Sequence, residues 1–346
     1  MNASFIADPV AGGPAPGLRA LGLAGRLAVR GLSVAAGRRL SILIFHRVLP
    51  QADPMFPDEL DARRFDTLMA VVARSFQVLP LADAVQRLAH DKLPPRALSI
   101  TFDDGYADNH DVALPILQRH GLPACFFIAT GFLGGGRMFN DTVIETLRHS
   151  PLPRVDLADF GLGRFALQTP AQRTAAVQAV LPGIKYLAPE QRPQALERLQ
   201  HLCQPRHLPD DLMMLPAQVQ ALHKAGMEIG AHTVRHPILC SVADAVAERE
   251  ITDSRQHLQG LLDSPVSLFA YPNGRPDRDY AGRHAALVRR LGFAAAVSTA
   301  PGTADNTADP FQLPRFTPWD HAPARWMARL IAMRRARSFS LAGEGC

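Results

Sequence analysis

Short apolar runs alternate with stretches of helical periodicity along most of this chain. Apolar positions recur every three or four residues in the helical stretches, whereas the runs between them are mostly apolar at consecutive positions. We read the apolar runs as strands at 41–45, 76–79, 97–100, 124–130, 227–231, 266–271, 293–298 and 311–316. The helical stretches are 60–75, 81–90, 114–120, 216–224, 242–262 and 279–291. This alternation predicts βα units around a parallel sheet.

The alternation stops between residues 132 and 215. This segment begins with three consecutive glycines at 134–136 and has helical stretches at 142–149, 171–180 and 189–202, separated by prolines. No Gly-Lys-Ser or Gly-Lys-Thr follows the glycines, so we interpret them as a hinge and not as a phosphate-binding loop. We expect a mostly helical insertion that serves as a lid or a substrate-recognition subdomain.

The patterns divide the chain into segments 1–39, 40–320 and 321–346. Residues 1–39 are rich in Ala, Gly and Pro and then alternate apolar residues with arginines, which predicts a disordered or amphipathic segment. A basic amphipathic helix there could lie on an anionic membrane surface or pack on the central domain. The pattern at 323–337 predicts a basic C-terminal helix.

Two adjacent carboxylates, Asp103 and Asp104, stand where the run at 97–100 ends. Neighbouring residues on a strand point to opposite faces, and burying an unpaired carboxylate costs several kcal/mol, so something must compensate this pair. His232 and His236 follow another strand and are four positions apart. Two histidines and a carboxylate form a common three-ligand set for a catalytic metal, with a position left for water.

Three motifs together resemble the polysaccharide deacetylases, the NodB-homology domain of carbohydrate esterase family four. They are Thr-Phe-Asp-Asp-Gly-Tyr at 101–106, His-Thr-Val-Arg-His at 232–236 and Phe-Ala-Tyr-Pro-Asn-Gly at 269–274. The resemblance covers roughly residues 40–320. It implies an α/β fold, a distorted (β/α) barrel of about seven strands with the helical insertion at about 132–215, and metal-dependent removal of an acetyl group from a sugar.

The resemblance also implies roles for the charged residues. Asp104, His232 and His236 would hold a divalent metal, most simply Zn²⁺, with Co²⁺, Ni²⁺ or Mn²⁺ as alternatives. Asp103 would be the general base that takes a proton from the attacking metal-bound water.

The third motif would supply the oxyanion and substrate-binding groups. The backbone N–H of Asn273 would stabilise the oxyanion, and Gly274 would permit the tight turn. Tyr271 and Arg275 belong to the same segment at the end of a strand, and we include both in the predicted site.

The sequence departs from the family pattern in two places. Many relatives carry an Arg that orients the catalytic Asp where this chain has Ala270, and Arg275 or Arg47 could replace it from another position. Many relatives also have a Leu-x-His where this chain reads Leu-Pro-Arg, ending at Arg315. An amine leaving group needs a proton, and we predict His46 as the general acid, with His321 as second choice.

Composition narrows the partners. The net charge of +5 and a pI near 9.3 favour anionic neighbours, such as a phosphorylated glycolipid or a membrane surface. The arginines are spread through the chain without interleaved aromatic residues, so we do not expect nucleic-acid binding. The four widely spaced cysteines suit a reducing compartment, and the N-terminus lacks the pattern of a signal peptide. We expect a cytoplasmic protein, peripheral at the inner face of the membrane if the basic helix binds there.

These observations predict a hydrolase that deacetylates an N-acetylated sugar of a polysaccharide or of its lipid-linked precursor. One alternative is hydrolysis of another amide or ester acyl group on a glycolipid. Another is a carbohydrate-binding homologue without turnover, suggested by the two departures. A redox iron site also uses two histidines and a carboxylate, but there the carboxylate usually lies close to one histidine in sequence.

Overall fold

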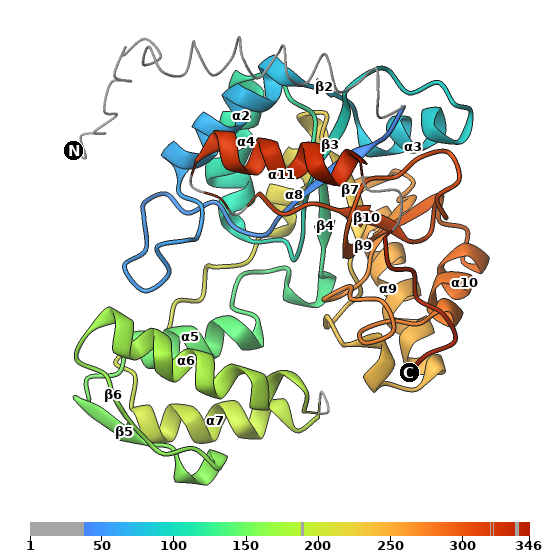
Figure 1. Ribbon diagram of the computed structural model, residues 1–346. Helices are drawn as coiled ribbons and strands as arrows, with labels where there is room; N and C mark the ends of the chain where they lie inside the picture. Colours follow the sequence, from blue (N-terminus) through green and yellow to red (C-terminus); the bar gives the residue numbers. More distant parts are fainter. Residues whose placement is uncertain (1–37, 188–189, 319, 321, 336–338) are drawn as a thin grey trace, which may run out of the picture.

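The computed structural model describes residues 38–187, 190–318, 320, 322–335 and 339–346 (Figure 1). Its centre is an eight-stranded sheet in which all the paired strands are parallel. The strands follow the order β1 (Ser41–Phe45), β3 (Ala97–Phe102), β4 (Cys125–Ile128), β7 (Glu228–Ala231), β8 (Leu268–Ala270), β9 (Ala295–Pro301) and β10 (Leu313–Arg315). The short strand β2 (Gln77–Val78) pairs with β3 beside this path.

The two ends of the sheet meet, so it nearly closes into a barrel. Ile44 N–H donates to the carbonyl of Phe316 at 3.1 Å, and Phe316 N–H donates to the carbonyl of Ile42 at 2.8 Å. These bonds join β1 to the residue that follows β10. The predicted distorted barrel of about seven strands is confirmed.

The side chains of β3 alternate between the outer face of the sheet and the interior of the barrel. Leu98, Ile100 and Phe102 belong to the cluster between the sheet and the outer helices, whereas Thr101 and Asp103 point to the barrel interior. The interior is packed so tightly that a Cβ on Gly230 would lie 2.4 Å from the Phe127 ring. At this level the barrel interior is filled by side chains, as in other barrels of this kind.

Helices surround this sheet (Figure 1). They are α2 (Ala62–Ser75), α3 (Leu81–Ala89), α4 (Leu114–Arg119), α8 (Pro216–Lys224), α9 (Asp244–Leu262), α10 (Gly282–Arg290) and α11 (Pro323–Arg335), with the short turns η1 (Asn109–Ala113), η2 (Thr130–Phe132) and η4 (Leu239–Ser241). Helix α2 begins where the Asp61 carboxylate accepts a hydrogen bond from Arg64 N–H at 2.8 Å. It then buries Phe65, Leu68 and Val72 at helical spacing, each contributing roughly 1.5–3 kcal/mol.

The segment between β4 and β7 carries its own apolar core. It contains α5 (Phe139–Arg148), β5 (Arg154–Asp156), η3 (Ala158–Phe160), β6 (Arg164–Ala166), α6 (Pro170–Lys185) and α7 (Arg192–Cys203). These elements lie together beside the barrel in Figure 1, where they are green to yellow, and they bury one apolar cluster that includes Val143, Val177 and Leu199. The three helices form where the sequence predicts them. The antiparallel β5–β6 hairpin was not predicted, because strands of three residues are too short for an alternation to show.

A disulfide joins Cys240 to Cys346, with their Cα atoms 5.7 Å apart. The sequence did not predict this pairing, because 106 residues separate the two partners and no local motif marks them. The C-terminal tail that it anchors also donates a hydrogen bond from Gly343 N–H to Asp277 at 2.8 Å. Cys125 and Cys203 are free and buried.

The predictions for residues 1–37 and for His321 lie outside the described residues. Within the described part of the chain, no helix combines the length and the apolar character needed to cross a bilayer. The cytoplasmic location and the contact with an anionic membrane stay predictions.

Removing the disulfide should weaken the fold. We expect Cys240→Ser to lower the free energy of unfolding by about 2–4 kcal/mol, because the cross-link restricts the unfolded chain. Urea denaturation of the oxidised protein measures this loss. Cys346→Ser should cost the same and the double variant no more, whereas additive losses would show that the two thiols act separately.

Candidate active site

Four of the predicted segments meet at the carboxyl ends of the barrel strands. His46 follows β1, the Asp103–Asp104 pair follows β3, His232 follows β7, and 271–274 follows β8. The shared cavity has a volume of about 210 Å³. Its lining residues are His46, Asp103, Asp104, Phe139, Asn140, Leu181, Lys185, His232, His236, Asn273 and Thr299.

Asp104, His232 and His236 converge on one point in this cavity. The Asp104 Oδ1 atom lies 3.4 Å from Nε2 of each histidine, and the three candidate ligand atoms all lie within 4.8 Å of one another. The turns that present them are unusual, because Asp104 has a φ of +77° and His236 a φ of +53°. A non-glycine residue in this region costs roughly 1–3 kcal/mol, and such strain is typical of functional sites.

The donor set fits a divalent cation. Asp104 Oδ1 is buried and has no hydrogen-bond partner among the described residues. His232 Nδ1–H donates to the carbonyl of Ala270 at 2.8 Å, which leaves the lone pair of Nε2 directed into the site. Burial lowers the pKa of His236 to about 3, so its imidazole is neutral at physiological pH, as a metal ligand must be.

Asp103 forms a buried, bidentate ion pair with Arg315. The two guanidinium nitrogens Nη1 and Nη2 donate to the carboxylate at 2.7 and 2.6 Å, and both side chains are almost fully buried. Arg315 also donates from Nε to the carbonyl of Ser298 at 2.8 Å and from Nη1 to Thr101 Oγ1 at 3.2 Å. Burial alone would raise the pKa of Asp103, but the Arg315 guanidinium, together with His232 and His46, outweighs burial and holds that pKa below its usual value. Asp103 is therefore ionised at neutral pH.

Neither arginine suggested by the sequence reaches Asp103. Arg47 pairs with Asp108, from Nε to Oδ2 at 2.8 Å, and its guanidinium stacks over the Tyr106 ring. Arg275 is exposed and does not line the cavity. The guanidinium comes instead from β10, the stretch where the sequence reading saw only a missing histidine.

The third motif is divided between the cavity and the core. Asn273 lines the cavity, with a φ of +57°, and Thr299 Oγ1 donates to its carbonyl at 2.7 Å. Gly274 has a φ of +68°, and a Cβ there would come within 3.0 Å of Thr299 N, so the turn requires glycine as predicted.

Tyr271 does not belong to the cavity. Its side chain is fully buried, donates its hydroxyl to the carbonyl of Phe311 at 2.8 Å and stacks on Tyr280. Its inclusion in the substrate-binding set is corrected, because the residues of β8 and the following loop alternate in direction and Tyr271 points to the outer apolar layer.

The insertion reaches the cavity through the start of α5. Tyr106, in the first motif, donates its hydroxyl to Asp141 Oδ1 at 3.2 Å and accepts a hydrogen bond from Asn140 Nδ2 at 3.1 Å. Burial raises the pKa of Asp141 to about 7. These contacts hold the neighbouring Phe139 and Asn140 at the cavity wall.

Comparison with known proteins agrees with the motifs. Residues 90–296, more than half of the chain, match the family model described as polysaccharide deacetylase. The chain belongs to the polysaccharide deacetylase family. Membership places the protein among hydrolases that deacetylate sugars.

Three proteins that are similar to this polysaccharide deacetylase family member share a fifth or less of its sequence. YxkH of Bacillus subtilis, named as a polysaccharide deacetylase, is 20% identical over 279 residues, which are 80% of this chain and 70% of YxkH. The Streptococcus pyogenes deacetylase PplD, solved with acetate, is 18% identical, with a TM-score of 0.56 over 86% of this chain and 98% of PplD. IcaB from Ammonifex degensii is 17% identical, with a TM-score of 0.55 over 87% of this chain and 98% of IcaB. These two structures share the fold.

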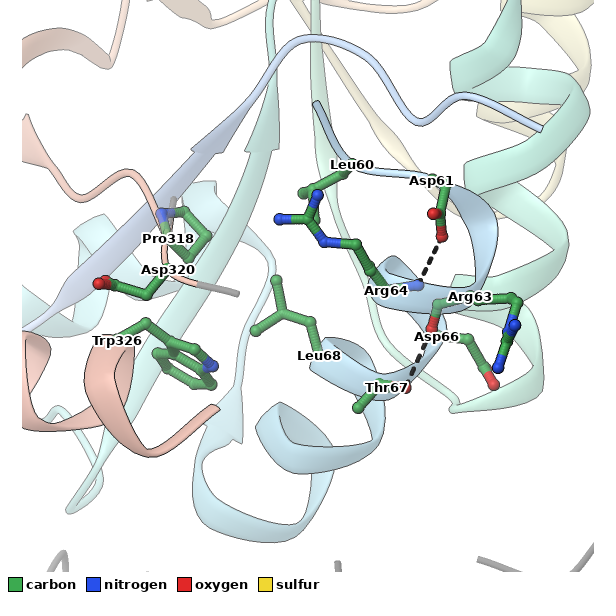
Figure 2. A pocket seen from close by; sticks show the side chains of 10 residues that line it. All are labelled: Leu60, Asp61, Arg63, Arg64, Asp66, Thr67, Leu68, Pro318, Asp320 and Trp326. Atoms are coloured by element: carbon green, nitrogen blue, oxygen red, sulfur yellow. Dashed lines mark hydrogen bonds between the residues drawn. The ribbon is translucent and has the colours of Figure 1, made fainter. Parts of the chain in front are cut away.

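A larger cavity, of about 480 Å³, lies between α2 and the segment that leads into α11 (Figure 2). Figure 2 shows the Arg64, Asp320 and Trp326 side chains around it. It contains none of the motif residues of the polysaccharide deacetylase family. We therefore assign the active site by its chemistry, to the smaller cavity.

Loss of Arg315 should destabilise this polysaccharide deacetylase family member in a pH-dependent way. We expect Arg315→Met to lower the free energy of unfolding at pH 7 by about 3–5 kcal/mol, because Asp103 is left buried and unpaired. A carboxyl group with a lowered folded pKa stabilises the protein above its unfolded pKa, and this contribution is lost as the pH falls through the folded value. The gap between wild type and variant should therefore narrow on acidification, as followed by urea denaturation across pH.

The matched control is the double variant Arg315→Met/Asp103→Asn, which removes both charges. It should recover most of the lost stability. A double variant as unstable as Arg315→Met would show that packing, and not the uncompensated charge, explains the loss.

Proposed function

We propose that this protein is a metal-dependent deacetylase that hydrolyses the acetamide of an N-acetylated sugar, in a polysaccharide or its lipid-linked precursor. The main support for the proposal is that two groups of residues lie side by side in one cavity. An Asp–His–His cluster with the geometry of a metal site lies beside a carboxylate that a buried guanidinium keeps ionised. Metal-assisted hydrolysis of an amide by water uses a metal site and a general base together.

Asp104, His232 and His236 would hold the cation, which when bound would polarise the acetyl carbonyl and lower the pKa of a water ligand. Asp103 acts as general base beside that position. Arg315 fixes both carboxylate oxygens of Asp103, so the base keeps one orientation and stays deprotonated.

Two further residues that line the cavity supply the remaining groups. The backbone N–H of Asn273 donates no hydrogen bond to another group of the described chain, and we assign it to the oxyanion. His46 is exposed at the cavity rim, and we assign it the transfer of a proton to the leaving amine.

The structure weakens the case for a carbohydrate-binding homologue without turnover. That alternative rested on a missing arginine and a missing histidine. Arg315 fills the first gap from another strand, and His46 lies in the cavity. Hydrolysis of a different acyl group stays open to test, and the mass lost from the product identifies the group removed.

Catalysis should depend on Asp103 and on metal. We expect protein loaded with Zn²⁺ or Co²⁺ to release acetate from N-acetylated oligosaccharides, and chelation to abolish the release. Asp103→Asn should lower kcat about 10²–10⁴-fold, because the general base is lost while the shape is kept. Asp253→Asn, on the exposed face of α9, is the control and should leave kcat unchanged. Activity that survives both chelation and Asp103→Asn would refute the proposal.

Two substrates with different leaving groups test the role of His46 separately from the other steps. An amine must be protonated to leave, whereas a nitrophenolate need not be. We expect His46→Gln to reduce acetamide hydrolysis by about 10²-fold or more and to affect hydrolysis of nitrophenyl acetate much less. Equal losses on both substrates would exclude the acid role, and His257→Gln, exposed on α9, controls for loss of a histidine.

A further inference from the structure

The wall that the insertion adds to the active-site cavity is cationic. Helix α6 ends at Lys185, and both Lys185 and Leu181, one turn earlier, line the cavity opposite the barrel residues. The carboxylates that line the cavity within the described chain are Asp103 and Asp104. Asp103 is paired with Arg315, and Asp104 belongs to the cluster with His232 and His236. Lys185 is partly buried and forms no ion pair with any described residue.

Arginines add to the positive field around Lys185. Arg192 donates from Nη2 to the carbonyl of Lys185 at 2.8 Å, and its guanidinium lies 4.6 Å from the centroid of the Phe139 ring, which itself lines the cavity. Arg278 donates to the hydroxyl of Tyr186, the residue after Lys185, and stacks over its ring. This contact joins the end of α6 to the loop that follows the third motif.

One carboxylate, that of Asp279, acts on Lys185 against these cations without forming an ion pair with it. Asp279 is buried; its Oδ2 accepts a hydrogen bond from Arg275 N–H at 3.0 Å, and its Oδ1 has no hydrogen-bond partner among the described residues. Burial lowers the pKa of Lys185, Asp279 opposes this in part, and Arg275, Arg278 and Arg192 lower that pKa further. A partly desolvated ammonium among arginines, open to a cavity, gains most from an anion that the protein does not itself supply.

We propose that Lys185 forms an anion subsite, and that the substrate carries a phosphate or carboxylate group on or next to the acetylated sugar residue. This inference rests on the proposed function, because it takes the cavity as the place where the acetamide binds. The cavity, at about 210 Å³, is smaller than the roughly 300–1,000 Å³ of ordinary ligand pockets, so the proposal places only one sugar residue with its charged substituent in it. The charged group lies against α6 while the acetamide faces Asp103.

Binding of matched monosaccharides tests the proposal without turnover. The background is Asp103→Asn, loaded with Zn²⁺, and the probes are N-acetylglucosamine, its 6-phosphate and N-acetylglucosaminuronic acid, measured by calorimetry. We expect the acidic sugars to bind more tightly than the neutral one. Adding Lys185→Met should weaken their binding relative to N-acetylglucosamine by about tenfold, the magnitude of a charge-assisted hydrogen bond.

Lys224→Met, at the exposed C-terminal end of α8, removes the same charge away from the cavity and should leave the ratio unchanged. A preference for the phosphate or for the carboxylate alone identifies which anion the subsite takes. Equal binding of acidic and neutral sugars, no binding of either, or an unchanged ratio in Lys185→Met each overturns the proposal.

Acetate release from the same three sugars by the wild-type protein separates this inference from the proposed function. Hydrolysis without any dependence on Lys185 would support the deacetylase and reject the anion subsite. Lys185-dependent binding of acidic sugars, with no acetate release from N-acetylated oligosaccharides either, would support the subsite and reject the deacetylase.

Discussion

The ion pair between Asp103 and Arg315 is the interaction on which the active site depends. A carboxylate inside an apolar barrel would be protonated, and so useless as a base, unless a fixed positive charge compensated it. Arg315 supplies that charge with bidentate geometry, and Ser298 and Thr101 satisfy further donors of its guanidinium. Because Arg315 lies on β10 and Asp103 follows β3, with β1 between these strands, the pair also ties the closing strand to the sheet.

Next to this ion pair, the turns that carry Asp104, His232 and His236 have strained backbones. Asp104 and His236 both have positive φ, and Thr233 between the histidines has a φ of +65°. Thr233 Oγ1 accepts a hydrogen bond from His236 N–H at 3.1 Å, which fixes the turn that brings both imidazoles to one side. The strained conformation persists because the surrounding barrel rim determines it.

The strands and the ligand set could be predicted from sequence because their signals are local. A buried strand is a run of apolar residues, and the Asp pair with His232 and His236 is recognisable by type and spacing. Arg315 was missed because the inside of a barrel is shared by all its strands, so a guanidinium can reach Asp103 from β10 as well as from the position of Ala270. The available signal was an arginine inside the apolar run at 311–316, which needs a buried carboxylate. The disulfide and the cationic wall were missed for the same reason, since each joins residues distant in sequence.

The insertion lies at a point in the fold where its sequence can vary independently of the barrel. It connects β4 to β7, which are adjacent in the sheet, and Met55 and Phe56 are the residues of its apolar cluster that lie outside the insertion. Its length and surface can therefore vary while the register of the two strands and the catalytic rim stay as they are. The insertion contributes Phe139, Asn140, Leu181 and Lys185 to the cavity wall, so changes in α5 and α6 can reshape this wall without moving the barrel strands.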